Sequence, residues 1–200
     1  MILIQRTFTG ALTLTALLTS GATAFESIVK PAMPAMDQAM AENGAGYGWA
    51  NHEVHTEDGY ILNMFRLLPP GVSRAADCHE CFAGEPVFLM HGVGGNAARW
   101  LNRVNQEIDS IPVALAKQGY DVWLGNTRGS SMAKEHEQLD WELDEAEYWD
   151  FSFPEIAMND LPALLSTVYD ETGGKKINFV GFQLGATEML FALSDETMQA

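Results

Sequence analysis

The sequence predicts an α/β fold in which a mostly parallel sheet is flanked by helices. Short apolar runs, typical of strands buried on both faces, occur at residues 86–90 and 120–124, and a third strand-like run occupies 177–180. Segments with helical spacing of apolar residues separate these runs. Strands that alternate with helices indicate βαβ units, so we expect parallel pairing between the strands.

Two segments precede the first expected strand. Residues 1–24 have the features of a secretory signal peptide, since Arg6 supplies a positive charge, residues 11–19 are mostly apolar and 22–24 form a small-x-small cleavage site. A membrane anchor is the alternative, but an apolar stretch of about 17 residues interrupted by threonines is short for a membrane span. Residues 25–46 form an N-terminal segment in which we expect a short amphipathic helix.

The remaining residues, 47–200, form the predicted domain. It opens with a β-hairpin, because strand-like runs at 52–56 and 60–67 flank the turn sequence at 57–59. Downstream of the strand at 86–90, a helix is expected from residue 111 to a stop at Gly119. A longer helix is predicted over 153–172, with the glycine pair at 173–174 as its end.

The charge composition argues against nucleic acids and anionic membrane surfaces as partners. The net charge is −16, and removal of residues 1–24 takes away only Arg6, which makes the chain more acidic still. Eight carboxylates lie between Glu135 and Asp150, interleaved with aromatic residues. A solvated face is the simpler interpretation; a metal or cationic-partner site is the alternative, although the segment lacks a recognisable metal-ligand spacing.

The two cysteines, Cys78 and Cys81, lie in the sequence Asp-Cys-His-Glu-Cys. In a secreted chain, a local disulfide in a surface loop is the favoured interpretation. Free thiols and a metal site are the alternatives. A structural zinc would need two further ligands, and only histidines such as His79 and His91 are near in sequence.

Residues 181–185 have the outline of a nucleophile elbow, G-x-S-x-G, in which Gln183 replaces the serine. A strand-like run precedes the motif, and an alanine- and leucine-rich segment typical of a helix follows it. The glycines at both ends, Gly181 and Gly185, allow strand and helix to approach closely. The pattern therefore predicts elbow geometry without the nucleophile.

Further motifs make the chain resemble the acid lipases of the gastric lipase and lysosomal acid lipase group. The similarity spans roughly residues 45 to 193 in preserved order, and it rests on Tyr47-Gly48, 52–62, His91-Gly92-Val93 with Trp100, 119–129, 148–153 and 160–163. The resemblance implies the N-terminal half of an α/β-hydrolase fold. It also implies a family reaction of neutral lipid ester hydrolysis, such as that of triacylglycerol or steryl ester, with no cofactor and no metal. The implied location is the secretory pathway, either extracellular or lysosomal or vacuolar.

The resemblance also assigns roles near the elbow. It places the oxyanion-hole N–H groups at Val93 and Leu184, and it places His91 in the oxyanion loop, where we expect a structural role. Gln183 has no hydroxyl or thiol that a base can deprotonate, and Phe182 replaces the polar residue usual before the serine. We therefore expect this chain not to hydrolyse esters through residue 183.

Other hydroxyls and the missing triad members reinforce that expectation. Thr187 and Ser194 lie further along the predicted helix and do not point out of the elbow. In α/β-hydrolases the triad acid and histidine follow the nucleophile, whereas all five histidines of this chain precede residue 183. The resemblance therefore places the acid and the base beyond Ala200.

Three functions stay open at this point. The first is a lipase-family protein that binds a lipid ester or acyl chain but has lost catalysis. The second is an incomplete or misread copy of an active acid lipase. The third is an interaction or structural subunit, because the elbow strand is expected to become a sheet edge that a protein partner, the N-terminal segment or continuing polypeptide covers.

Overall fold

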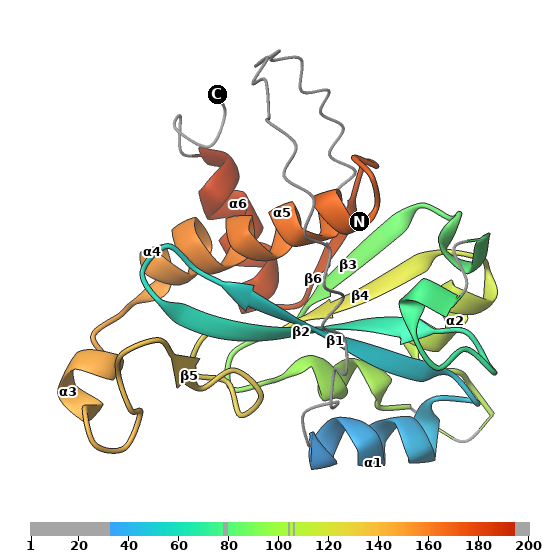
Figure 1. The fold of residues 1–200 in the computed structure, drawn as a ribbon, viewed down its shortest axis with the longest axis horizontal. Helices are drawn as coiled ribbons and strands as arrows, with labels where there is room; N and C mark the ends of the chain where they lie inside the picture. The colour runs from blue at the N-terminus through green and yellow to red at the C-terminus, as the bar shows by residue number, and fades with distance from the viewer. Residues whose placement is uncertain (1–32, 78–79, 104, 106, 195–200) are drawn as a thin grey trace, which may run out of the picture.

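The computed structural model describes residues 33–77, 80–103, 105 and 107–194, and these fold around one mixed sheet (Figure 1). The main strand order is β1-β2-β4-β3-β6, and β5 pairs with β2. The strands are β1 (Gly48–His55), β2 (Tyr60–Leu68), β3 (Pro86–Met90), β4 (Asp121–Gly125), β5 (Glu135–His136) and β6 (Asn178–Gly181).

Helices cover both faces of this sheet. The α-helices are α1 (Pro34–Asn43), α2 (Ile111–Lys117), α3 (Glu145–Tyr148), α4 (Phe153–Glu155), α5 (Leu161–Glu171) and α6 (Leu184–Ser194). Short 3₁₀ turns form η1 (Ala75–Asp77), η2 (Glu80–Phe82) and η3 (Ala97–Leu101), and a π-helical turn forms η4 (Ile156–Asp160). The flanked sheet confirms the predicted α/β class.

The sheet combines an antiparallel hairpin with parallel strands. β1 and β2 pair antiparallel over their full length, and Gly59 in the connecting turn has φ +92°, a conformation that favours glycine. β3 pairs parallel with both β4 and β6. The predicted hairpin is confirmed, and its first strand begins at Gly48, four residues earlier than expected.

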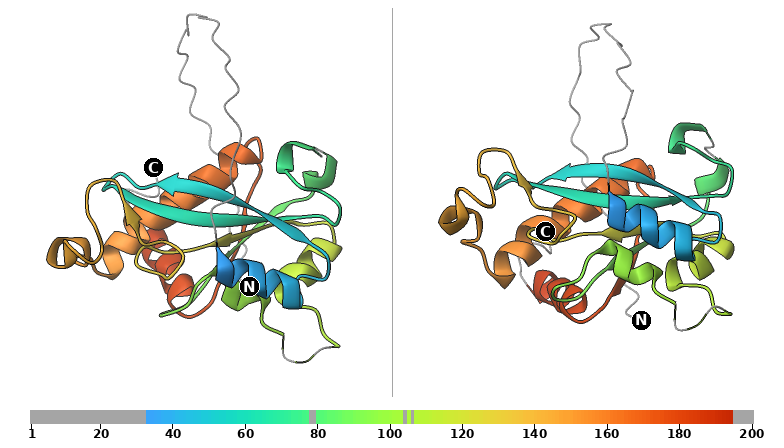
Figure 2. Two further views of the ribbon diagram at one scale, coloured as in Figure 1. Left: turned by 60° about the horizontal axis from the view of Figure 1, so that its bottom comes forward. Right: turned by 90° about the horizontal axis from the view of Figure 1, so that it is seen from below.

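Two apolar cores lie on opposite faces of the sheet. α5 packs over one face, together with α4 and α6, whereas α1, η3 and α2 cover the other (Figures 1 and 2). β3 serves both cores, because successive side chains of a strand point to opposite faces. Phe88 belongs to the core under α5, and its neighbour Leu89 belongs to the core under α1. This explains why the strand is apolar at every position.

The helix predicted over 153–172 is confirmed as one unbroken helical segment from Phe153 to Glu171, but it is not α-helical throughout. The structure has α4, then the π-helical turn η4, then α5. Pro162, in the first turn of α5, lacks the N–H that a regular α-helix would need at that position. The wider turn before it accommodates this missing donor. The predicted end is correct, since Gly173 and Gly174 both have positive φ.

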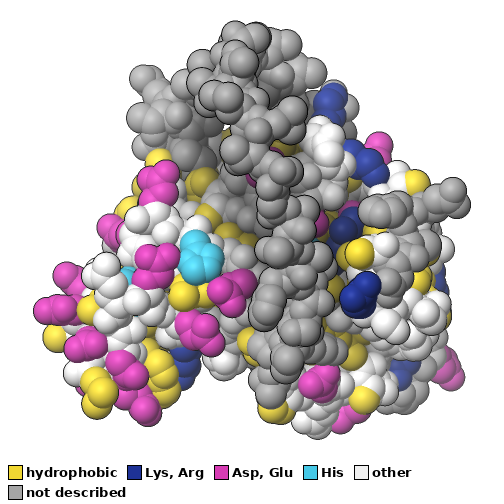
Figure 3. Space-filling view, in the orientation of Figure 1, with side chains coloured by type: hydrophobic (Ala, Val, Ile, Leu, Met, Phe, Trp, Pro, Cys, Tyr) yellow, Lys and Arg dark blue, Asp and Glu magenta, His cyan; other side chains and the backbone are white. Residues whose placement is uncertain are grey.

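The acidic segment 135–150 forms one end of the molecule. It contains β5 and α3, which the sequence pattern did not predict, and its eight carboxylate residues are all exposed. Figure 3 shows Asp and Glu side chains gathered there, at the lower left. The same segment also contains Tyr148, whose side chain is fully buried in the core under α5. The exposed carboxylates favour the interpretation of a solvated face.

β6 forms one edge of the described sheet. It pairs with β3 alone among the described strands, and all four of its residues are only partly buried. The neighbouring helix α6 exposes Leu190 and Phe191. Over the described part of the chain, no helix combines the length and apolar character required to cross a membrane.

Candidate functional site

The predicted elbow lies where β6 ends and α6 begins. Gln183 stands between them with φ +50°, a left-handed conformation that residues other than glycine rarely adopt. The Phe182 N–H donates to the Met90 carbonyl at 3.0 Å, which ties the turn to the end of β3. The Ala186 N–H donates to the Gln183 carbonyl at 3.1 Å and starts the helix. Strand, strained turn and helix are therefore in the arrangement that the motif requires.

The two elbow glycines, Gly181 and Gly185, lie very close to backbone atoms of neighbouring segments. A Cβ added at Gly181 would lie 2.4 Å from the Ala186 nitrogen, and one at Gly185 would lie 2.7 Å from the carbonyl oxygens of Met90 and His91. Cβ atoms do not approach other atoms this closely. Any larger residue would therefore push α6 away from the sheet.

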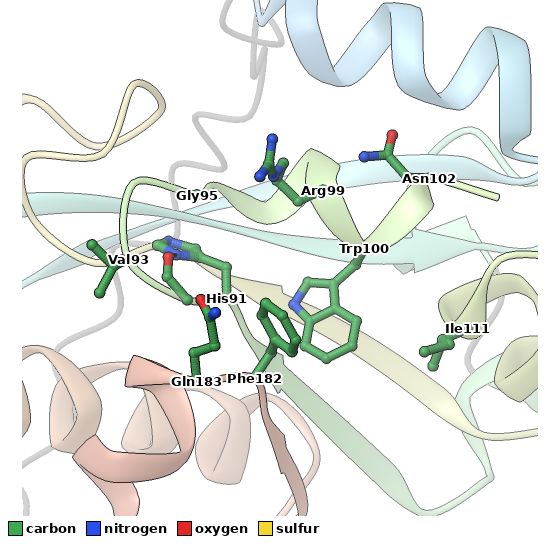
Figure 4. A pocket seen from close by; sticks show the side chains of 10 residues that line it. His91, Val93, Gly95, Arg99, Trp100, Asn102, Ile111, Phe182 and Gln183 are labelled. Atoms are coloured by element: carbon green, nitrogen blue, oxygen red, sulfur yellow. Dashed lines mark hydrogen bonds between the residues drawn. The ribbon is translucent and has the colours of Figure 1, made fainter. Parts of the chain in front are cut away.

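The Gln183 side chain fills part of the space in front of the elbow. A Cβ on Gly92 would lie 2.7 Å from Gln183 Oε1 and 3.0 Å from Gln183 Cβ, so this side chain lies directly against the Gly92 backbone. Figure 4 shows the side chain reaching toward the segment that holds His91 and Val93. The predicted nucleophile position thus faces the predicted oxyanion loop.

A pocket of about 270 Å³ opens beside Gln183. Its walls come from the segment after β3, from η3, from the start of α2 and from the elbow (Figure 4). The apolar part includes Trp100 and Phe182, whose rings meet edge to face with centroids 6.5 Å apart, and Ile111. Arg99 is the only Arg or Lys among its lining residues, and none of these is an Asp or a Glu.

His91 supports the loop rather than offering a base to the pocket. Its ring is buried, and Nδ1 lies 2.9 Å from the Gly92 carbonyl, to which it donates. Nε2 accepts the Thr127 N–H at 3.3 Å. Burial lowers the pKa of His91, which keeps the ring neutral. Both ring nitrogens are occupied within the fold, as expected of a structural histidine.

The two predicted oxyanion positions have unused N–H groups. Val93 is 72% exposed and lines the pocket, and Leu184 is the first residue of α6. Within the described part of the chain, neither backbone N–H donates a hydrogen bond. Val93 lies in a loop, and Leu184 is at the start of a helix, where a backbone N–H has no intrahelical acceptor. This explains why both N–H groups are unused.

Cys81 is not among the residues that line this pocket. Cys81, in η2, is disulfide-bonded, whereas Cys78 lies outside the described residues. Among the described residues, no group of three or more His, Cys, Asp or Glu side chains is placed to hold a metal ion.

Sequence reasoning missed a buried carboxyl behind the elbow. Glu188 on α6 is fully buried, and neither of its carboxyl oxygens has a hydrogen-bond partner. Burial, with a smaller contribution from Asp160, raises the pKa of Glu188 to about 8. The available signal was that Glu188 is the one charged residue in the otherwise apolar α6 sequence.

A second polar cluster, centred on Arg128, joins three of the segments that carry the resemblance, although their spacing in the sequence does not indicate a network. Arg128 donates to Asp160 through its backbone N–H and Nε, at 2.8 and 2.7 Å. Its guanidinium also binds both carboxylate oxygens of Asp58, at 2.6 and 2.8 Å, and lies 3.9 Å from the ring centroid of Tyr60. This cluster, which we call the Arg128 cluster, joins the hairpin turn to η4.

Comparison with known families gives two matches that together cover the hairpin, the pocket and the elbow. A partial α/β-hydrolase lipase region matches residues 40–104, and the α/β-hydrolase fold matches residues 85–198. The chain belongs to the α/β-hydrolase family. Within it, the similarity is to lipases, so the predicted relationship to the gastric lipase group is confirmed.

Relatives of this α/β-hydrolase carry lipase names. Gastric triacylglycerol lipase of Bos taurus is 40% identical over 149 residues, which cover 74% of this chain and 36% of the relative. Lipase member M of Mus musculus is 39% identical over 150 residues, covering 74% and 33%. A probable lipase of Schizosaccharomyces pombe is 36% identical over 149 residues, covering 74% and 31%. The chain thus spans about a third of the length of these relatives.

Among solved structures, an esterase from Pyrococcus furiosus overlaps 74% of this α/β-hydrolase chain and 48% of its own chain, with a TM-score of 0.49 and 19% identity.

Proposed function

We propose that this chain is a lipase-family protein that holds a lipid ester or acyl chain beside its elbow and does not hydrolyse it through residue 183. The observation that carries the proposal is Gln183 itself, which occupies the strained elbow position with φ +50°. The nucleophile position therefore keeps its geometry but has a different functional group.

The chemistry of an amide explains the loss of hydrolysis. Acyl transfer needs a hydroxyl or thiol that becomes nucleophilic on deprotonation and can leave again. The glutamine amide offers no such atom, and the Gln183 side chain lies against Gly92, in the space where a scissile carbonyl would sit. Thr187 does not substitute, because its hydroxyl donates to the Gln183 carbonyl within α6.

The binding half of the site has separate support. The unused N–H groups of Val93 and Leu184 suit the oxyanion-hole role, and that role depends on the main chain rather than on the side chains. The pocket supplies apolar surface for an acyl chain. By analogy with relatives named triacylglycerol lipases, the acyl chain is one that occurs in neutral esters such as triacylglycerol or a steryl ester, and no cofactor is involved.

The location that accompanies this function is the secretory pathway, extracellular or lysosomal or vacuolar. The support is the signal-like sequence of residues 1–24, which lie outside the described residues.

An esterase assay tests the proposal. The purified protein and its Gln183→Ala variant are incubated with p-nitrophenyl butyrate, and both are expected to release p-nitrophenol no faster than buffer. Turnover that disappears in Gln183→Ala would show that Gln183 takes part in the chemistry. Turnover that survives in Gln183→Ala would show another nucleophile. Either result overturns the proposal.

A second candidate is an active acid lipase whose residue 183 or downstream sequence is misread or incomplete. The retained elbow geometry favours it, because a strained turn has no evident use without a nucleophile. Sequencing the transcript around codon 183 and past codon 200 decides between the two. A serine codon, with downstream Asp and His, would restore ester hydrolysis.

A third candidate is a non-catalytic interaction subunit that pairs through the β6 edge with a protein partner. The support is that β6 pairs only with β3 within the described sheet and that Leu190 and Phe191 are exposed nearby. Size-exclusion chromatography with light scattering tests self-assembly, and a clean monomer at low concentration would count against a homo-oligomer.

A further inference from the structure

The pocket beside the elbow differs in charge from the chain as a whole. The chain carries a net charge of −16, whereas the pocket lining includes Arg99 and no Asp or Glu from the described residues. His91 adds no charge there, because burial lowers its pKa. A negatively charged ligand in this pocket therefore meets one positive side chain, Arg99, and no carboxylate among the described lining residues.

The elbow also presents more hydrogen-bond donors than a serine elbow would. The Gln183 amide brings two N–H donors to a place where a hydroxyl brings one. Gln183 is exposed and lines the pocket together with Val93, whose backbone N–H has no acceptor among the described residues. Figure 4 shows Arg99 on η3, with its side chain extending away from Gln183. The polar end of the pocket thus holds donors from Gln183, Val93 and Arg99, beside the Gln183 Oε1 acceptor that faces Gly92.

The rest of the pocket is apolar and small. Trp100, Phe182 and Ile111 line it, and its volume is about 270 Å³. This is just below the roughly 300–1,000 Å³ of pockets that hold drug-sized ligands. As formed by the described residues, it has room for one acyl chain of medium length rather than for the three chains of a triacylglycerol.

We propose that this pocket binds the carboxylate form of a single medium-chain fatty acid in preference to the corresponding neutral ester. The carboxylate accepts hydrogen bonds from the Gln183 amide and the Val93 N–H, and Arg99 at the rim attracts its charge. Hydrogen bonds to an ionised group are stronger than those to a neutral carbonyl, so the acid gains more from these donors than the ester does. The acyl chain lies along Trp100 and Phe182. This inference rests on the proposed function, because it needs an elbow that binds ligand without consuming it.

Titration calorimetry on the full chain at pH 7 tests the preference with octanoate and methyl octanoate. Octanoate is expected to bind about tenfold more tightly than its methyl ester, the difference of a charged over a neutral hydrogen bond. Gln183→Glu, which keeps the side-chain size but replaces two donors with a negative charge, is expected to weaken octanoate about tenfold and to change methyl octanoate affinity little.

Arg99→Gln is a second variant, at an exposed position. It is expected to lower the affinity for octanoate about two- to threefold and to leave the affinity for methyl octanoate unchanged. The matched control is Lys176→Gln, which removes one exposed positive charge outside the pocket lining and is expected to leave both affinities unchanged. Circular dichroism on each variant verifies that it folds, and if Gln183→Glu does not fold, Arg99→Gln still tests the charge preference.

The outcomes separate this inference from the proposed function. Equal or tighter binding of methyl octanoate overturns the carboxylate preference but leaves acyl-chain binding intact. Absence of binding by either ligand overturns both. Release of methanol from methyl octanoate, followed by NMR in the same samples and absent in Gln183→Ala, overturns the proposed function. An equal effect of Lys176→Gln and Arg99→Gln on octanoate overturns the role given to Arg99.

Discussion

The Arg128 cluster and the elbow use their polar groups in opposite ways. In the Arg128 cluster, one guanidinium and one backbone N–H bind two carboxylates, and the Arg128 side chain is only 1% exposed. At the elbow, the Val93 N–H has no acceptor among the described residues, and Phe182 is 57% exposed. Groups that are satisfied inside the fold stabilise it, whereas groups with unused bonding capacity at a pocket are available to a ligand.

The largest expected effect comes from breaking the satisfied region. Arg128→Gln leaves the buried carboxylate of Asp160 without its cation, and we expect a loss of about 3–5 kcal/mol in the free energy of unfolding at pH 7. Urea unfolding measures it. The control is Lys117→Gln, which removes an exposed pair with Asp109 at 2.7 Å and should cost less than about 1 kcal/mol. Similar small losses in both variants would contradict the role of the Arg128 cluster.

A second prediction concerns Glu188, which lies behind the elbow and, unlike Asp160, has no bonded partner. Its folded-state pKa of about 8 lies above the usual 4.5, so the folded protein holds a proton that the unfolded chain releases. Protonated Glu188 contributes its full share of the free energy of unfolding below pH 4.5. This contribution decreases as the pH rises above 4.5 and is lost as the pH passes through 8. Glu188→Gln should therefore be more stable than the wild type at pH 8, by roughly 4 kcal/mol, with no gain at pH 4.

Thermal and urea unfolding of both proteins between pH 4 and pH 9 verify this dependence. Asp160, the charged neighbour on η4, has its own pKa raised to about 6 by burial, so the variant should keep a residual slope near that pH. A constant difference between the two proteins at all pH values would show that Glu188 does not titrate in this range.

A third prediction tests the close approach of α6. Gly185→Ala places a Cβ 2.7 Å from two carbonyl oxygens, and we expect it to cost about 1–3 kcal/mol in unfolding free energy. Gly48→Ala is the matched control, because its nearest contact would be an ordinary 3.5 Å and the expected change is within about 0.5 kcal/mol. If both substitutions prove neutral, the elbow is not held by close backbone contact.

The smallest effect is expected at the elbow residue itself. Gln183→Gly removes the cost of a left-handed conformation in a residue with a side chain, while glycine adds entropy to the unfolded chain. The net gain should be about 0.5 kcal/mol. Gln118→Gly, where φ is −87°, should instead destabilise, because no strain is relieved there. Differential scanning calorimetry compares the two, and equal destabilisation would mean that residue 183 is not strained.

Much of the fold was predictable because it depends on local patterns. The apolar run at 86–90 became β3 with the same bounds, and Gly59 and Gly119 have the positive φ that their turn and helix-end positions suggested. The helix over 153–172 was predicted, but its π-helical turn was not, because apolar spacing does not distinguish a regular α-helix from one with a wider turn before Pro162. β5 was not predicted, because the formation of a two-residue strand depends on pairing with β2 rather than on its own sequence.

The sequence by itself determined the family and the functional group at the elbow. Glycine spacing and the order of motifs are properties of the chain, and an amide at position 183 has the same chemistry in any conformation. Only the tertiary structure decided that Gln183 has a left-handed backbone beside a pocket with no Asp or Glu among its described lining residues, and that Glu188 is buried without a hydrogen-bond partner among the described residues. Burial and electrostatic environment arise from segments distant in sequence, so no local pattern encodes them.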